Sequence, residues 1–87
     1  MRYELEIHPK CLDEIRKLSK KNPVLEHALK KKIDHILENP FHFKPLRYDL
    51  AGERRVHVMK SYVLRYDVKE STVTLLFFGH HDEAYRR

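Results

Sequence analysis

Histidine, tyrosine and arginine gather at the C-terminal end of the sequence, directly after its most apolar segment. VTLLFF (residues 73–78) has the composition of a buried strand, and GHHDEAYRR (residues 79–87) follows it. Imidazoles exchange protons near neutral pH, guanidinium groups stabilise negative charge, and an aromatic ring can stack on an unpaired base. Such a set could cleave RNA without a metal: a base takes the 2′-OH proton, cations stabilise the phosphorane, and an acid protonates the leaving 5′-oxygen.

Two upstream segments carry more groups of the same kind. In RRVHVM, Val56 and Val58 alternate with Arg55 and His57, and SYVLRYDV alternates in the same way around Arg65. Because successive strand residues point to opposite faces, the valines predict a core face and the polar residues an open face. We therefore expect an open face that bears Arg55, His57 and Arg65, has His80, His81, Tyr85, Arg86 and Arg87 at its rim, and includes Lys44 and Arg47 from a preceding loop.

The remaining histidines and the single cysteine favour ordinary structural roles. His8, His27, His35 and His42 are isolated in the sequence, which is typical of surface residues. The adjacent pair His80 and His81 should point in different directions on a strand, and no Cys or His partner stands at a zinc-finger spacing. Cys11 is expected to be a small buried hydrophobe. The sequence thus predicts no metal site and no cofactor.

The elements that must position these groups can be predicted from hydrophobic periodicity. YELEIH alternates between apolar and polar residues, which predicts a half-buried strand. Pro9 opens a helix whose apolar stripe is Leu12, Ile15 and Leu18. Asn22 caps a second helix that begins at Pro23. That helix ends at Asn39 and Pro40, and three strands follow, the last of which is apolar on both faces and so central in the sheet. The expected core includes Leu12, Ile15, Leu29, Ile33, Val58 and Leu64.

The order β-α-α-β-β-β predicts an α+β fold with one domain over residues 1–87. An N-terminal strand is followed by an antiparallel helix hairpin and a three-stranded antiparallel meander, and the hairpin packs on one face of a four-stranded sheet. The chain has 87 residues, which is one domain, and a net charge of +5, which favours nucleic acid, acidic membranes or acidic proteins as partners. It lacks a membrane-spanning apolar stretch and a signal-peptide pattern, so we expect a cytoplasmic protein.

The element order and three stretches resemble the RelE/ParE superfamily of toxins from toxin–antitoxin systems. The stretches are KPLRYDLAGERRVHV, SYVLRYDV and GHHDEAYRR. In the RelE-like branch, the resemblance implies a ribosome-dependent mRNA endonuclease that cuts by 2′-OH attack. It also implies a cognate antitoxin as partner, together with the ribosome and mRNA, in a toxin–antitoxin complex that can oligomerise further. The ParE-like branch instead inhibits DNA gyrase.

The sequence departs from the RelE-like pattern at one position. RelE-like members usually have a pattern such as YRLVY in the third strand, with arginine directly after the aromatic residue. This chain has YVLRY, so Val63 stands where that arginine is expected, and Arg65 lies two residues further on. A YafQ-like member is more similar, since that subgroup also has an aliphatic residue at this position. It depends instead on histidines, which by position match His57 and His81. Ser61 falls where the subgroup has an aspartate, and Lys44 falls where it has a loop histidine.

The resemblance gives each candidate a role. His81 is the expected general acid, and His57 is the expected base or a phosphate ligand. Arg55 and Arg65 stabilise charge, and Tyr85 stacks on a base or assists proton transfer. Phosphate or RNA contacts are expected from Lys44, Arg47, Arg55, His80, Arg86 and Arg87. Two alternatives stay open: a ParE-like gyrase inhibitor, and a catalytically inactive RelE-fold protein that binds antitoxin or RNA.

Overall fold

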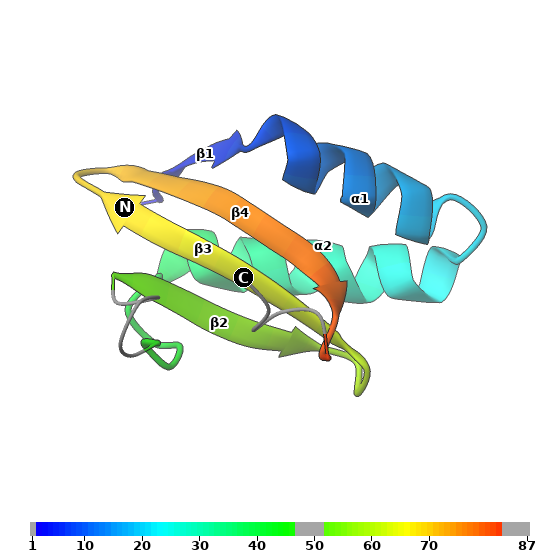
Figure 1. Ribbon diagram of the computed structural model, residues 1–87. Helices are drawn as coiled ribbons and strands as arrows, with labels where there is room; N and C mark the ends of the chain where they lie inside the picture. Colours follow the sequence, from blue (N-terminus) through cyan, green and yellow to red (C-terminus); the bar gives the residue numbers. More distant parts are fainter. Residues whose placement is uncertain (1, 47–51, 83–87) are drawn as a thin grey trace.

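The computed structural model describes residues 2–46 and 52–82, which form a four-stranded sheet with two helices on one face (Figure 1). The elements are β1 (Glu4–Ile7), α1 (Pro9–Ser19), α2 (Pro23–Glu38), β2 (Glu53–Val58), β3 (Tyr62–Lys69) and β4 (Thr72–His80). This order confirms the α+β prediction.

The four strands form one mixed sheet in the order β1-β4-β3-β2. The strands β2, β3 and β4 are the predicted antiparallel meander, and β1 pairs parallel to β4. As its apolar sequence predicted, β4 lies inside the sheet. The pairing with β1 covers only the first part of β4, because the register ends where Ile7 lies opposite Leu75.

Both helices begin where the sequence places their start signals. Pro9 opens α1, and the Nδ1 atom of His8 accepts a hydrogen bond from the Lys10 backbone N–H. Asn22 caps α2 in the same way, by accepting from the Leu25 N–H at 3.1 Å. Within the described part of the chain, neither helix is long and apolar enough to cross a membrane.

The core lies between the helices and one face of the sheet, and its strand register is as predicted. Val58 is fully buried whereas His57 is exposed. Leu29 and Leu64 are buried in the same cluster, and partly buried Ile15 and Ile33 pack against it. The buried cluster comprises Cys11, Leu25, Leu29, Ile36, Leu37, Val56, Val58, Leu64, Tyr66, Val73, Leu75 and Phe78.

The prediction for Leu12 was wrong. It is only partly buried and lies outside the core cluster, whereas its neighbour Cys11 is 1% exposed within it. The inward stripe of α1 thus begins one residue earlier than predicted and runs from Cys11 through Ile15 to Leu18. Burial, and to a lesser extent the Glu14 carboxylate, raises the pKa of the Cys11 thiol to about 11, so this cysteine is an inert core residue.

The chain that leaves α2 is fixed to the sheet by one buried tyrosine. The hydroxyl of Tyr66 donates a hydrogen bond to the Pro40 carbonyl, and Arg54 donates to the Phe43 carbonyl at 2.8 Å. Burial raises the pKa of Tyr66 to about 12, against a smaller opposing effect of Arg54, so the hydroxyl stays a donor at neutral pH. These bonds hold the loop that carries Lys44 against β2.

We expect Tyr66→Phe to lower the free energy of unfolding by about 1–3 kcal/mol, because the buried Pro40 carbonyl loses its donor. Urea denaturation would measure the loss. Tyr62→Phe is the matched control: Tyr62 is partly exposed and makes ring contacts, so its loss should stay within about 0.5 kcal/mol. Equal losses in the two variants would show that the Tyr66 hydroxyl does not anchor the loop.

Candidate functional site

On the sheet face opposite the helices, called here the open face, three neighbouring rows of side chains across the strands form the candidate site and its surroundings. The strand register places like residues side by side. An acidic row crosses all four strands, a cationic row follows, and an imidazole row lies nearest the end of β4. The acidic row is Glu6, Thr74, Asp67 and Glu53; the cationic row is Phe77, Arg65 and Arg55; the imidazole row is Gly79, Val63 and His57.

The structure brings together the two histidines to which the sequence assigned catalysis. The rings of His57 and His81 stack with centroids 5.4 Å apart and an interplanar angle of 17°. His57 comes from β2, and His81 follows β4, two strands away in the sheet. The His81 backbone N–H donates to the Ser61 carbonyl at 2.8 Å, which anchors it to the β2–β3 hairpin.

A β-bulge in β4 is the reason that His81 lies on the open face. Arg65 pairs with Phe77 whereas Tyr66 pairs with Leu75, so Leu76 is an extra residue in the ladder. An extra residue reverses the alternation for the rest of the strand. Without it, a strand that buries Leu75 would turn Phe77, Gly79 and His81 to the helix face.

The same alternation separates the two adjacent histidines, as the sequence predicted. The ring of His80 lies 4.8 Å from that of Tyr62, which packs against the helix-side core. His81 turns to the other face and meets His57. The two imidazoles are therefore not equivalent, although His80 still lines the edge of the hollow beside the pair.

The electrostatic surroundings of the imidazole pair are asymmetric. His57 is largely exposed, yet desolvation at its surface and then the charges of Arg55, His81 and Lys32 lower its pKa from the usual 6.5. This favours a neutral ring at pH 7. The Nδ1 atom of His81 lies 3.9 Å from a carboxylate oxygen of Asp82, which is within ion-pair distance of a protonated ring.

A shallow hollow of about 450 Å³ lies beside the pair and is large enough for a phosphate group. Its lining combines the imidazoles with the tip of the β2–β3 hairpin and the residue after His81. The residues are His57, Lys60, Ser61, His80, His81 and Asp82. Lys60 and Asp82, both exposed, were not assigned to the site from the sequence, because their place there depends on the fold bringing the hairpin next to the end of β4.

The predicted charge-stabilising arginines lie directly opposite one another on β2 and β3. Such a pair of like charges is unfavourable, and Glu53 compensates for it: its carboxylate accepts from Arg65 Nη1 at 2.9 Å. Arg65 is thereby held within the sheet face, with 13% of its side chain exposed. Lys44 lies beside this row, because its backbone carbonyl accepts a hydrogen bond from the Arg55 N–H at 3.2 Å. Its side chain is exposed.

Val63, which occupies the position of the arginine expected from RelE-like sequences, is completely buried. It lies between His57 and Gly79 in the imidazole row, so its side chain supplies an apolar floor there and no charge. Arg47, Tyr85, Arg86 and Arg87, also assigned to the site from the sequence, lie outside the described residues. Among the residues described, no group of three or more His, Cys, Asp or Glu could hold a metal ion.

We expect the His57 imidazole to titrate below the usual pKa, and Arg55→Gln to raise that pKa by removing a nearby positive charge. NMR detection of the side chain during a pH titration would measure both effects. Lys69→Gln is a control at the opposite end of β3 and should leave the titration unchanged. A His57 pKa above 6.5 in the wild-type protein would contradict the expected neutral base.

Comparison with known proteins places the chain in a family. Residues 5–85 match the family model described as ParE toxin of type II toxin-antitoxin system, parDE. The chain belongs to this toxin family. A relative from Methanocaldococcus jannaschii, named "Putative toxin RelE4", is 41% identical over 87 residues, which cover 98% of this chain and 93% of the relative.

Solved structures of RelE-type and YafQ-type toxins share the fold of this family member. A mutant of Escherichia coli toxin RelE in the free state has a TM-score of 0.78 and 26% identity, covering 97% of this chain and 88% of the other. The E. coli DinJ-YafQ toxin-antitoxin complex contains a chain with a TM-score of 0.77 and 18% identity, covering 99% of this chain and all of the other. The RelE/ParE superfamily predicted from the sequence is therefore confirmed.

Proposed function

We propose that this toxin is a metal-independent endoribonuclease that cleaves mRNA on the ribosome. The observation that carries the proposal is the stacked pair of His57 and His81 on a cationic sheet face. A pure binding surface does not require two stacked imidazoles from distant parts of the chain, one near cations and the other near a carboxylate. Acid–base cleavage of RNA does, because one group must accept a proton and another must donate one.

The geometry supports a base role for His57 and an acid role for His81. Neutral His57, whose pKa is lowered, takes the proton of the ribose 2′-OH. The 2′-oxygen attacks the adjacent phosphorus and the P–O5′ bond breaks. Protonated His81, with Asp82 beside it, gives its proton to the leaving 5′-oxygen. The products are a 2′,3′-cyclic phosphate and a 5′-hydroxyl, and no other reactant is consumed.

The stacked arrangement also limits where the phosphate can sit. With the ring centroids 5.4 Å apart, there is no room for a phosphate between the rings. The phosphate must instead lie across the edges of both rings, over the hollow that Ser61 and Lys60 help to line. Arg55 and Lys60 are then the cations best placed to stabilise the phosphorane, while Arg65 contributes from its ion pair with Glu53.

The proposal includes a cognate antitoxin that covers the open face, since the chain belongs to a toxin family of type II toxin-antitoxin systems. With a net charge of +5, the toxin should attract acidic side chains to the cationic and imidazole rows. The acidic row at the other end of the face should in turn favour basic residues of the partner. The toxin is expected to act in the cytoplasm, where translating ribosomes are found.

Gyrase inhibition is the second candidate, and the match to the ParE toxin model favours it. Purified toxin should be added in parallel to a translation reaction on a defined mRNA and to a gyrase supercoiling assay. We expect mRNA cuts that require ribosomes, seen by primer extension, and unchanged supercoiling. Loss of supercoiling with intact mRNA would instead identify a gyrase inhibitor.

A further inference from the structure

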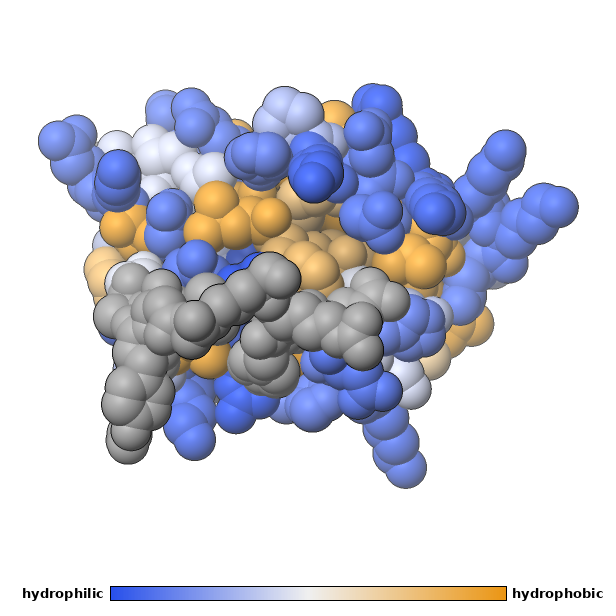
Figure 2. Space-filling view, viewed as in Figure 1, coloured by the Kyte–Doolittle hydropathy of each residue, from blue (hydrophilic) through white to orange (hydrophobic). Residues whose placement is uncertain are grey.

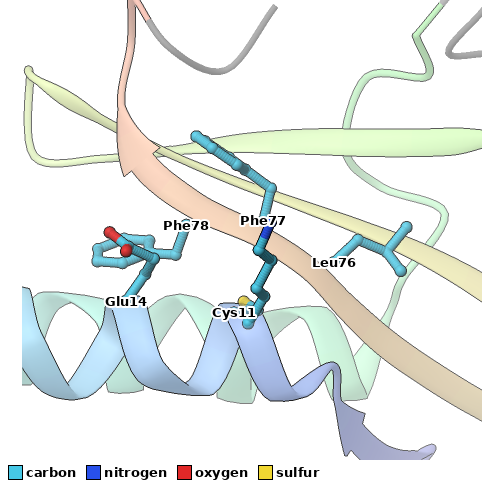
Figure 3. Close-up of a pocket in the computed structure, with 6 residues that line it drawn as sticks. Cys11, Glu14, Leu76, Phe77 and Phe78 are labelled. Carbon is cyan, nitrogen blue, oxygen red and sulfur yellow. The ribbon is translucent and has the colours of Figure 1, made fainter. Parts of the chain in front are cut away.

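Phe77 is an aromatic residue on the open face that the mechanism above does not use. Its ring is partly exposed in a row otherwise formed by arginines. Figure 3 shows that the ring extends from β4 away from helix α1, which carries Cys11 and Glu14, whereas Phe78 extends toward the helix side. Figure 2 shows apolar surface in the middle of the same face, surrounded by hydrophilic side chains.

Gly79 makes the position of this ring possible. A Cβ atom at Gly79 would lie 2.9 Å from Cζ of Phe77, which is closer than real Cβ contacts allow. The ring therefore lies along the strand over Gly79, toward the imidazole row. Two residues of a strand span roughly 7 Å, so the backbone of Phe77 lies one such step from the row of His57, and its ring extends across that step to Gly79.

The two sides of the Phe77 ring have different neighbours: Arg65 lies on one side, and β1 has already ended on the other. On the side of β3, the Arg65 guanidinium lies 4.9 Å from the ring centroid, and Glu53 fixes it there. On the other side, the pairing of β1 ends at Leu75, so in the described chain no strand runs beside Phe77. A hollow of about 280 Å³ opens along this edge of β4 and includes Lys10 in its lining.

We propose that Phe77 is a nucleobase-stacking residue that binds an unpaired mRNA base next to the phosphate cleaved at His57 and His81. The proposal rests on the proposed RNA-cleaving function and adds a base subsite to it. Gly79 and Arg65 are positioning residues, because one gives the ring its space and the other holds a cation against it. Stacking on a ring accepts any base, so this subsite contributes affinity and alignment without sequence preference.

The test uses a short RNA with 2′-O-methyl groups at every ribose, which cannot be cleaved, and an abasic RNA of equal charge. Binding is measured by fluorescence anisotropy at low salt. Loss of one stacked base typically costs ~1–3 kcal/mol, so Phe77→Leu should weaken binding of the complete RNA roughly 5- to 150-fold. Binding of the abasic RNA should not change. Phe77→Tyr keeps the ring and should bind as wild type, and unfolding curves check that each variant is folded.

Three results would overturn the inference. Phe77→Leu could bind the complete RNA as tightly as wild type, it could weaken both RNAs equally, or the wild-type protein could fail to prefer the complete RNA. Any of these results would rule out the base subsite, even if the wild-type protein still cuts mRNA on ribosomes. Conversely, Phe77-dependent binding without ribosome-dependent cleavage would retain the base subsite and refute the proposed nuclease.

Discussion

Replacement of His81 by alanine should lower ribosome-dependent mRNA cleavage by about 10²- to 10⁴-fold, which is the usual contribution of one positioned acid or base. His81 is exposed after the end of β4, and its ring contacts His57. Folding should change little, because the residue lies outside the core, and antitoxin binding should change little, because the other side chains of the open face remain. Cleavage rates from primer extension, together with an unfolding curve, would measure both effects.

His80→Ala is the matched control for this prediction. The two histidines are adjacent and both exposed, but the ring of His80 faces Tyr62 on the other side of the strand. Its replacement should change cleavage by a few fold at most. If His80→Ala were inactive and His81→Ala active, the acid would be assigned to the wrong imidazole; if both cleaved normally, charge stabilisation alone would have to carry the reaction.

Phe78→Ala should have the largest effect on stability, a loss of about 3–5 kcal/mol in the free energy of unfolding. The side chain is 0% exposed, and its ring stacks on Tyr62 at 5.7 Å between centroids. The total free energy of unfolding of a small domain is only about 5–15 kcal/mol. Phe78→Leu, which leaves a smaller cavity, should therefore be measured beside it by urea denaturation.

Leu76→Ala is the internal control, because Leu76 is the extra residue of the bulge and only partly buried. We expect a loss of about 1 kcal/mol there. A loss at Leu76 equal to that at Phe78 would show that the faces of β4 are assigned wrongly after Leu75. The location of His81 on the open face would then be wrong as well.

Alternating strands and amphipathic helices were predictable because their periods are visible in the sequence. Val56 and Val58 fixed the face of β2, and this alone placed His57 on the open side. Asn22 with Pro23 marked the start of α2. In α1, Cys11 and Leu12 are adjacent and both apolar, so the pattern could not decide which one faces the core.

The details of the candidate site depend on features that have no local signal. The bulge at Leu76 lies in a continuous apolar run, where either alternation fits the sequence. The contact of His57 with His81 and the place of Phe77 over Gly79 both follow from that bulge. The ion pair of Glu53 with Arg65 depends on the β2–β3 register, which residue spacing alone does not determine.

The most direct test of the central claim is the chemistry of the cut ends. Purified toxin should be added to ribosomes that hold a defined mRNA codon, and the fragments should be analysed by mass spectrometry. The account predicts a 2′,3′-cyclic phosphate upstream and a 5′-hydroxyl downstream, and no cut when the nucleotide 5′ of the cleaved bond carries a 2′-deoxyribose. Cleavage of the 2′-deoxy mRNA, or a 5′-phosphate on the downstream fragment, would contradict attack by the 2′-hydroxyl with His57 as base and His81 as acid.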